Sequence, residues 1–405
     1  MEFLEKIKQE LRPDSSVIRE VNDFVQELNS ELERHKIKAV CVAGGSVAKS
    51  TFLKGDFDVD IFVRFDYSYK DRDISKILEP VLKKYKYELL HGSRDYFQIK
   101  DNLNYEIVPV LDIKDPKLAM NVTDMSPMHV DWVKKHLKEG REDDIRLTKK
   151  FCKVAGVYGA ESYIRGFSGH VIDIMIIYYG SFLNLLKAAV KWKAPVIIDP
   201  VGYYKSNRDV VLSMNQSKIE GPLIVVDPLL QTRNAASAIS YEKFSLFKKR
   251  AASFLKNPSE KFFSEVKITK DSLNRKYKNI TILTLKAVTG KKDVVGSRIV
   301  KSFSFMKSEL KKVGYDIKSS GWYWGRHVLF WFSVKNKILP KTRIIQGPPI
   351  NIEEHANSFR EKYKKCFEKN RKLYAEVVIE KRKIEENITN IAADSAFRLK
   401  VVKIE

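Results

Sequence analysis

Residues 57–62 read FDVDIF and place two acids, Asp58 and Asp60, inside an apolar run. The alternation of polar and apolar residues predicts a β-strand, in which residues two apart share one face. The two carboxylates therefore lie close together and resist joint ionisation. A divalent cation removes this repulsion, and Mg²⁺ prefers such oxygen ligands together with water and phosphate oxygens. The spacing predicts a magnesium site.

A turn containing Gly44, Gly45 and Ser46 precedes these acids, between a predicted strand and a short helix. Backbone N–H groups at such a turn are available to bind an anion. An anion site beside metal-binding acids suits phosphoryl or nucleotidyl transfer. Glu106, on a predicted strand over 104–111, is the candidate third carboxylate of a two-metal site. Each motif alone is more often structural, but their order and spacing together favour catalysis.

The elements that must position these residues form a small mixed α/β unit. Its helices are predicted over 2–35, with an interruption at 13–16, and over 74–86. Its strands are predicted near 38–44, 57–65, 87–91, 94–100 and 104–111.

The remaining chain changes character twice. Helical periodicity dominates to about residue 256, with helices predicted over 126–137, 142–155, 169–192 and 240–255 and a loop-rich stretch over 193–238. Residues 277–345 then read strand, helix, strand, strand, the pattern of an open sheet with a helix packed on it. Residues 352–405 are charged and helix-rich, with one apolar strand at 375–380.

The charge is distributed unevenly along the 405 residues, whose net charge is +23. Residues 1–140 contain 23 basic and 25 acidic residues, whereas residues 141–405 contain 51 basic and 26 acidic residues. An excess of positive charge is typical of nucleic-acid or anionic-membrane binding, and it is equally typical of a lysine-rich proteome. The first interpretation predicts that the catalytic residues lie in the near-neutral part and that the basic part binds the polyanion.

Composition also indicates the compartment. The longest apolar run, over 171–180, is too short to span a membrane. The N-terminal residues predict an amphipathic helix rather than a signal peptide. Cys41, Cys152 and Cys366 fit neither a zinc site nor a disulfide framework. We therefore expect a cytoplasmic protein in a reducing environment, without a membrane partner.

The GGS turn, the D-V-D strand and the later acid resemble the nucleotidyltransferase superfamily that includes DNA polymerase beta. Further blocks resemble the archaeal, class I CCA-adding enzymes, a family of tRNA nucleotidyltransferases. These blocks are NVTDMSPMHVDWV (121–133), RLTKKFCKVAGVYGAESYIRGFSGH (146–170), YYGSF (178–182), VVDPLLQTRNAASAIS (225–240) and QGPPI (346–350). The resemblance extends from about residue 40 to at least residue 350.

The resemblance implies template-independent addition of C, C and A to the 3′ end of tRNA from CTP and ATP, with two Mg²⁺ ions and release of pyrophosphate. It also implies an α+β fold in three parts. These are a polymerase-beta-like catalytic head (1–140), a helical neck with nucleotide-binding and base-selecting residues (141–256), and a body with a sheet resembling an RNA-recognition module plus a helical tail (257–405). The last part would bind the acceptor stem and elbow of tRNA.

Site residues are implied one by one from the same resemblance. The catalytic and metal-binding residues are Asp58, Asp60 and Glu106. The nucleotide-binding residues are Gly45, Ser46, Lys49, Ser126, His129, Lys149 and Tyr158. Arg233 is the base-selecting residue. Two positions depart from the family pattern, since Glu106 replaces the usual Asp and Lys49 stands where Arg, with its bidentate fork, is common.

Several alternatives stay open from the sequence. The chain could add only CC or only A, act as a poly(A)-type polymerase on the same head, or be a catalytically silent tRNA-binding module. Trp322, Tyr323 and Trp324 either stack on RNA bases or fill a core, with at least one in the core. His91 and His170 are interpreted as structural. A homodimer is compatible with the sequence but is not readable from it.

Overall fold

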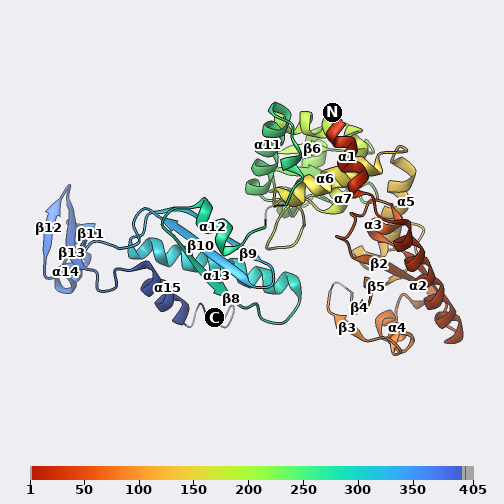
Figure 1. The fold of residues 1–405 in the computed structure, drawn as a ribbon, viewed down its shortest axis with the longest axis horizontal. Coiled ribbons are helices and arrows are strands. Elements are labelled where there is room, and N and C mark those ends of the chain that lie inside the picture. The colour runs from red at the N-terminus through yellow and green to blue at the C-terminus, as the bar shows by residue number, and fades with distance from the viewer. Residues whose placement is uncertain (1, 93, 266, 395–396, 398–405) are drawn as a thin grey trace. The chain divides into compact units, whose positions relative to one another are not determined.

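The chain divides into two compact units, Met1–Val266 and Lys267–Glu405. The computed structural model describes residues 2–92, 94–265, 267–394 and 397 (Figure 1). Each unit is considered by itself.

A five-stranded mixed sheet organises the first part of the N-terminal unit, with strand order β1-β2-β5-β4-β3. The strands are β1 (Ala39–Ala43), β2 (Val59–Phe65), β3 (Tyr87–Leu90), β4 (Tyr96–Lys100) and β5 (Asn104–Leu111). The β2–β5 pair is parallel and the other three pairs are antiparallel. The five strands predicted from sequence are therefore all present.

Helices α2 (Ser15–Arg34) and α4 (Ile74–Leu82) supply apolar side chains to the core of this sheet. The core includes Val59 and Ile61, both fully buried, which flank Asp60 in the sequence. Burial of these two residues opposite Asp60 confirms the alternation predicted from FDVDIF. Short helices connect the elements, namely α3 (Gly45–Ala48), η1 (Tyr67–Tyr69), η2 (Pro116–Leu118) and η3 (Val122–Met125).

A second hydrophobic core in the same unit is largely helical. It is built from α1 (Glu2–Leu11), α5 (Ser126–His136), α6 (Glu142–Val154), α7 (Gly169–Tyr179), α8 (Phe182–Lys191) and α11 (Tyr241–Lys256). The loop-rich stretch holds a two-stranded parallel sheet, β6 (Val196–Ile198) with β7 (Leu223–Val225), and helices α9 (Asn207–Ser213) and α10 (Gln216–Ile219). Helix η4 (Glu260–Phe262) follows α11.

The single helix predicted over 169–192 is two helices in the structure. Gly180 ends α7 in the left-handed conformation (φ 81°), and Ser181 caps α8 by accepting a hydrogen bond from the Asn184 amide. Glycine adopts this conformation without steric cost, so it terminates helices readily. Among the described residues, no single helix has the length and hydropathy of a membrane span. Helices α7 and α8 together have that length and hydropathy, but they are bent by 93° relative to each other.

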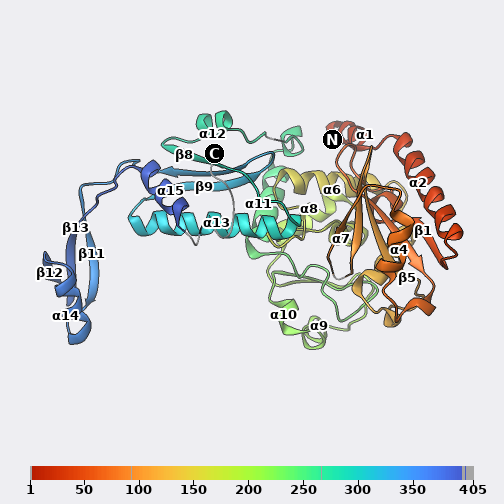
Figure 2. The same cartoon turned by 90° about the horizontal axis from the view of Figure 1, so that it is seen from below.

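The C-terminal unit contains a three-stranded antiparallel sheet of order β8-β10-β9. Its elements are β8 (Ile280–Leu285), α13 (Lys292–Val313), β9 (Ile317–Trp324) and β10 (Val328–Val334), in the order predicted from sequence. Helix α13 packs on one face, against Phe330 and Phe332, and α12 (Lys270–Lys276) packs on the other, near Trp331 (Figure 2).

The end of the chain adds a sheet to the predicted helices. Strands β11 (Thr342–Pro349), β12 (Cys366–Lys369) and β13 (Lys372–Val378) pair antiparallel in the order β11-β13-β12, and β13 covers most of the strand predicted at 375–380. Helix α14 (Glu353–Lys362) lies beside β11, and α15 (Ile384–Ala393) packs against α13.

Candidate active site

The parallel pairing of β2 and β5 brings two predicted acids together. Asp60 lies directly opposite Glu106 in the register of the two strands. Asp58 stands just before β2, and its Oδ1 accepts a hydrogen bond from the Asn104 side-chain amide at the start of β5. Glu106 Oε1 also accepts a hydrogen bond of 3.4 Å from Gln98 on β4. The three carboxylates therefore lie near the N-terminal ends of two adjacent strands, β2 and β5.

The glycine turn lies against these acids. The Gly44 amide donates a 2.7 Å hydrogen bond to the carbonyl of Asp60. Gly45 has φ +51°, and a Cβ atom placed on it would lie 1.6 Å from Asp60 Oδ2. Only glycine is compatible with both the conformation and the space. Gly45, Ser46 and Lys49 at this turn are therefore held next to the candidate metal-binding acids.

Electrostatics at Asp60 favour a bound cation. Burial raises the pKa of Asp60 to about 6, and the charge of Asp58 adds to this effect, while Lys49 and Lys149 oppose it. A dication would relieve both the desolvation and the repulsion between the acids. The donors are carboxylate oxygens, which suit a hard ion. These residues fit a divalent cation.

Three of the predicted nucleotide-binding residues lie near the start of α7. Asp173, whose side chain is fully buried, forms an ion pair with Lys49. A Cβ atom on Gly169 would lie 3.2 Å from the Tyr158 hydroxyl and 3.8 Å from Lys149 Nζ, so both groups converge on the first turn of α7. Tyr158, Lys149 and Lys49 thus face one small region beside the acids.

Lys149 is a buried cation with a specific set of partners. Its Nζ donates to the carbonyl and hydroxyl oxygens of Thr51, at 3.0 and 3.2 Å. Burial lowers the pKa of Lys149 to about 8, an effect that Asp173 opposes and Lys49 reinforces. Burial, together with the charge of Asp173, holds the pKa of the Tyr158 hydroxyl well above its usual range. The positive charges of Lys49 and Lys149 would attract a polyanion that enters this region, and the attraction is stronger here than in water because the region is largely desolvated.

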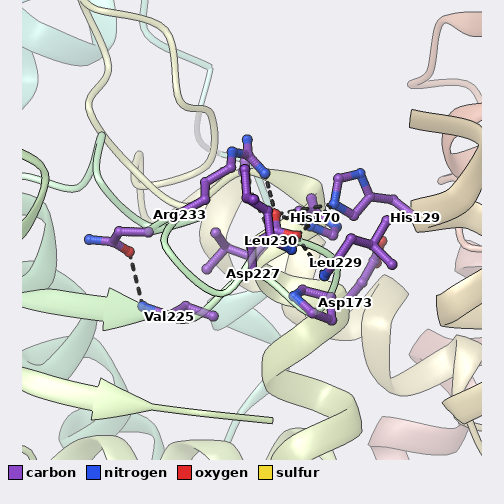
Figure 3. A network of polar contacts seen from close by, with 12 residues as sticks. His129, His170, Asp173, Val225, Asp227, Leu229, Leu230 and Arg233 are labelled. Carbon is purple, nitrogen blue, oxygen red and sulfur yellow. Dashed lines mark hydrogen bonds and ion pairs between the residues drawn. The ribbon is translucent and has the colours of Figure 1, made fainter. Parts of the chain in front are cut away.

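Another buried carboxylate, Asp227, contacts two further predicted residues, His129 and Arg233 (Figure 3). His129 Nε2 on α5 lies 2.9 Å from Asp227 Oδ1, and the Arg233 guanidinium donates to Asp227 Oδ2. His170 Nε2 on α7 lies 3.6 Å from the same carboxylate, and the rings of His129 and His170 are 4.3 Å apart. The structure therefore joins the predicted triphosphate-binding histidine to the predicted base-selecting arginine.

Ser126 is placed less directly. It is the first residue of α5, one turn before His129, and α5 contacts both α3 and α7. Apart from Ser126, the predicted residues thus fall into three groups, which are the acids with the glycine turn, the residues at the start of α7 near Asp173, and the pair around Asp227.

Sequence interpretation missed four residues of these groups, namely Thr51, His170, Asp173 and Asp227. A signal was present for two of them. Asp173 is the one acid in the apolar helix VIDIMII, and Asp227 ends the apolar run LIVVD. A carboxylate in an apolar segment is buried at high cost unless cations or hydrogen-bond donors surround it. His170, interpreted as structural, lies in the Asp227 group.

The acids on adjacent strands, the glycine turn and the neighbouring cations define a nucleotidyltransferase. Residues 18–129 match the model described as "Nucleotidyltransferase domain", and residues 143–264 match "tRNA nucleotidyltransferase, second domain". Among solved structures, a cytoplasmic RNA terminal U-transferase superposes with a TM-score of 0.52 at 15% identity, covering 66% of this chain and 98% of that one. The Cid1 poly(U) polymerase gives 0.53 at 14% identity, covering 65% and 98%. At this identity the likeness shows the fold alone.

Curated relatives identify the family. The CCA-adding enzyme of Nanoarchaeum equitans is 36% identical over 80% of this chain and 80% of its own length. That of Methanocaldococcus jannaschii is 30% identical over 92% of this chain and 86% of its own length. The chain belongs to the archaeal, class I family of CCA-adding enzymes, and it is a nucleotidyltransferase with an α+β fold, as the sequence motifs predicted.

Proposed function

We propose that this chain adds C, C and A to the 3′ end of tRNA, without a template, from CTP and ATP. The observation that carries the proposal is the convergence of Lys49, Lys149 and Tyr158 on the first two turns of α7, beside the half-buried Asp60. This arrangement suits a triphosphate whose α-phosphorus lies near the acids. Matches to CCA-adding enzymes favour the complete addition over a CC-only, A-only or poly(A)-type activity and over a silent module.

Asp58, Asp60 and Glu106 would hold Mg²⁺, with two ions when the triphosphate is bound. When bound, the metal would lower the pKa of the attacking 3′-hydroxyl and offset charge on the leaving group. Lys49 and Lys149 would bind the non-bridging oxygens of the triphosphate, with Ser46 and Tyr158 supplying hydroxyl groups. Pyrophosphate would leave from this cationic region.

Glu106 is one methylene longer than the aspartate usual in the family. Its backbone position opposite Asp60 is fixed by the parallel register, so the extra length must be absorbed by the side chain. The hydrogen bond from Gln98 restrains that side chain. We propose that Glu106 serves as the third metal ligand despite the substitution.

Base selection would rest on Arg233, whose side chain is one-third exposed while its guanidinium contacts the buried Asp227. A guanidinium donates hydrogen bonds to the acceptor edges that C and A present. Arg233→Ala should therefore reduce the preference for CTP and ATP over UTP and GTP more than it reduces tRNA affinity. Unchanged preferences in this variant would remove Arg233 from the role.

Binding of tRNA at its acceptor stem and elbow is assigned to the basic C-terminal unit. Residues 267–405 contain 32 basic and 14 acidic residues. A cavity of about 340 Å³ on the α12 face of the β8-β10-β9 sheet is lined by Lys270, Tyr323 and Arg326, among others. Tyr323 is 39% exposed and is available to stack on a base.

The deciding experiment measures incorporation of labelled CTP and ATP into tRNA that lacks its 3′ CCA, with and without Mg²⁺. We expect ordered incorporation of two C and one A, dependent on the divalent ion. Substrates ending at each stage, offered with each nucleotide, separate full addition from CC-only or A-only activity. Absence of incorporation with any divalent ion would contradict the proposed function.

A further inference from the structure

Asp227 begins a loop that follows β7 and ends at Arg233. Its carboxylate accepts hydrogen bonds from the amides of Leu229 (2.9 Å) and Leu230 (3.3 Å). Its own amide donates to the carbonyl of Arg233 at 3.0 Å, and the Arg233 amide donates to the carbonyl of Leu230 at 2.9 Å. The loop therefore returns on itself, and this brings the Arg233 side chain back to the carboxylate at its start (Figure 3).

Three side chains from three segments meet this carboxylate. His129 comes from α5, His170 from α7 and Arg233 from the loop itself. Asp227 is fully buried, and His129 is only 13% exposed. Burial alone would raise the pKa of Asp227, but the hydrogen bond with His129, the nearby His170 and the charge of Arg233 hold it well below its usual range. The carboxylate stays ionised and is surrounded by donors.

The two ends of this network serve different parts of the proposed substrate. His129 is assigned to the triphosphate and Arg233 to the base, and neither contact to a nucleotide requires Asp227 itself. A guanidinium on a flexible side chain reads a base edge only if its planar fork is held in one orientation. The buried carboxylate supplies that constraint, because a charged hydrogen bond restrains the fork in a largely desolvated place.

We infer that Asp227 is a positioning residue that fixes Arg233 and His129 in one arrangement, so that the base and the triphosphate of the incoming nucleotide are read together. This inference rests on the proposed function. It accounts for a fully buried carboxylate beside the proposed nucleotide site, where its negative charge would otherwise oppose triphosphate binding. It also gives His170, 3.6 Å from the carboxylate, a place in the same arrangement.

Asp227→Asn is the informative variant, because it keeps the size of the side chain while removing its charge. The preference is measured as the ratio of kcat/KM for CTP or ATP to that for UTP or GTP, on tRNA substrates ending at each stage. We expect Asp227→Asn to lose about 10- to 100-fold in this ratio, approaching Arg233→Ala. The double variant Asp227→Asn/Arg233→Ala should lose no more than Arg233→Ala alone, since both changes remove the same interaction.

Asn234 provides a matched control in the same loop. It is buried, and its side chain donates to the carbonyls of Lys218 and Leu223 and accepts from the amides of Val225 and Ala236. Asn234→Ser should therefore loosen the loop without removing the Asp227–Arg233 contact. We expect a similar fall in melting temperature in the two variants, but a lower nucleotide preference only in Asp227→Asn.

Three results would overturn the inference. These are a wild-type preference in folded Asp227→Asn, a fully additive loss in the double variant, and an equal loss of preference in Asn234→Ser at equal stability. If Asp227→Asn does not fold, NMR of the Arg guanidinium groups in the wild-type protein is the second test. A held Arg233 gives separate Nη signals, and averaged signals would contradict the inference. A wild-type protein without incorporation would contradict the proposed function instead.

Discussion

Gly45→Ala tests how closely the glycine turn constrains the catalytic acids. An alanine Cβ at this position would lie 1.6 Å from Asp60 Oδ2, whereas ordinary contacts begin at 3.4 Å. Either the turn or the Asp60 carboxylate must therefore move by roughly 2 Å. Because Gly44 is hydrogen-bonded to the Asp60 backbone, the side chain is the part that can move.

Two magnitudes follow from this geometry. Placing alanine at φ +51° costs about 1 kcal/mol of folding free energy, which corresponds to a fall of about 2–4 °C in melting temperature for a domain of this size. A displacement of 1 Å in a catalytic group can cost about 100-fold in rate. We therefore expect kcat for CMP incorporation to fall at least 100-fold, with only a small loss of stability.

Gly55→Ala is the control. Gly55 has φ +68°, yet no atom lies within 4 Å of the position its Cβ would take. This variant should show the same conformational cost and near-normal turnover. The assay is single-turnover incorporation of labelled CTP, together with thermal unfolding of both variants. Equal turnover in Gly45→Ala and Gly55→Ala would refute the constraint on Asp60.

Further predictions concern the acids, the buried lysine and the basic unit. Asp58→Ala or Asp60→Ala should nearly abolish incorporation while tRNA affinity in a filter-binding assay stays close to wild type; substantial turnover in either would disprove the metal assignment. Lys149, with a pKa of about 8, carries a charge below that pH and loses it above, so KM for CTP should rise as the pH passes 8. In Lys149→Arg the rise in KM should disappear, because the guanidinium stays charged. If KM still rises in this variant, a group other than Lys149 causes the pH dependence. Binding of tRNA should weaken steeply between low and moderate salt, and Arg326→Ala should reduce both the affinity and the slope; salt-independent binding would contradict backbone recognition.

Sequence patterns predicted the strand that carries the two acids, and also the fold class, because both depend on the local periodicity of polar and apolar residues. Asp58 and Asp60 are two residues apart, and the flanking Val59 and Ile61 are fully buried. The family resemblance then supplied Lys49, Lys149 and Tyr158, which the structure gathers at the start of α7. The assignment of a role to each of these residues stays a prediction.

The sequence did not predict which residues far apart in the chain contact each other. Asp173 meets Lys49 across 124 residues, and Asp227 meets His129 across 98 residues. No sequence period connects such positions, since their proximity depends on how the two cores pack.

The break at Gly180 was missed for a different reason. Both helices continue the same apolar composition, and they are separated by Gly180 in the left-handed conformation and by the Ser181 cap of α8.

The proposed active site draws on two hydrophobic cores, with the acids on the sheet core and Lys149 and Asp173 on the helical core. A sheet core exchanged for that of another nucleotidyltransferase would bring its own acids and glycine turn, while the helical core would keep the loop that holds Arg233. Chimeric proteins joined between β5 and α5 would then inherit chemistry from one parent and nucleotide preference from the other.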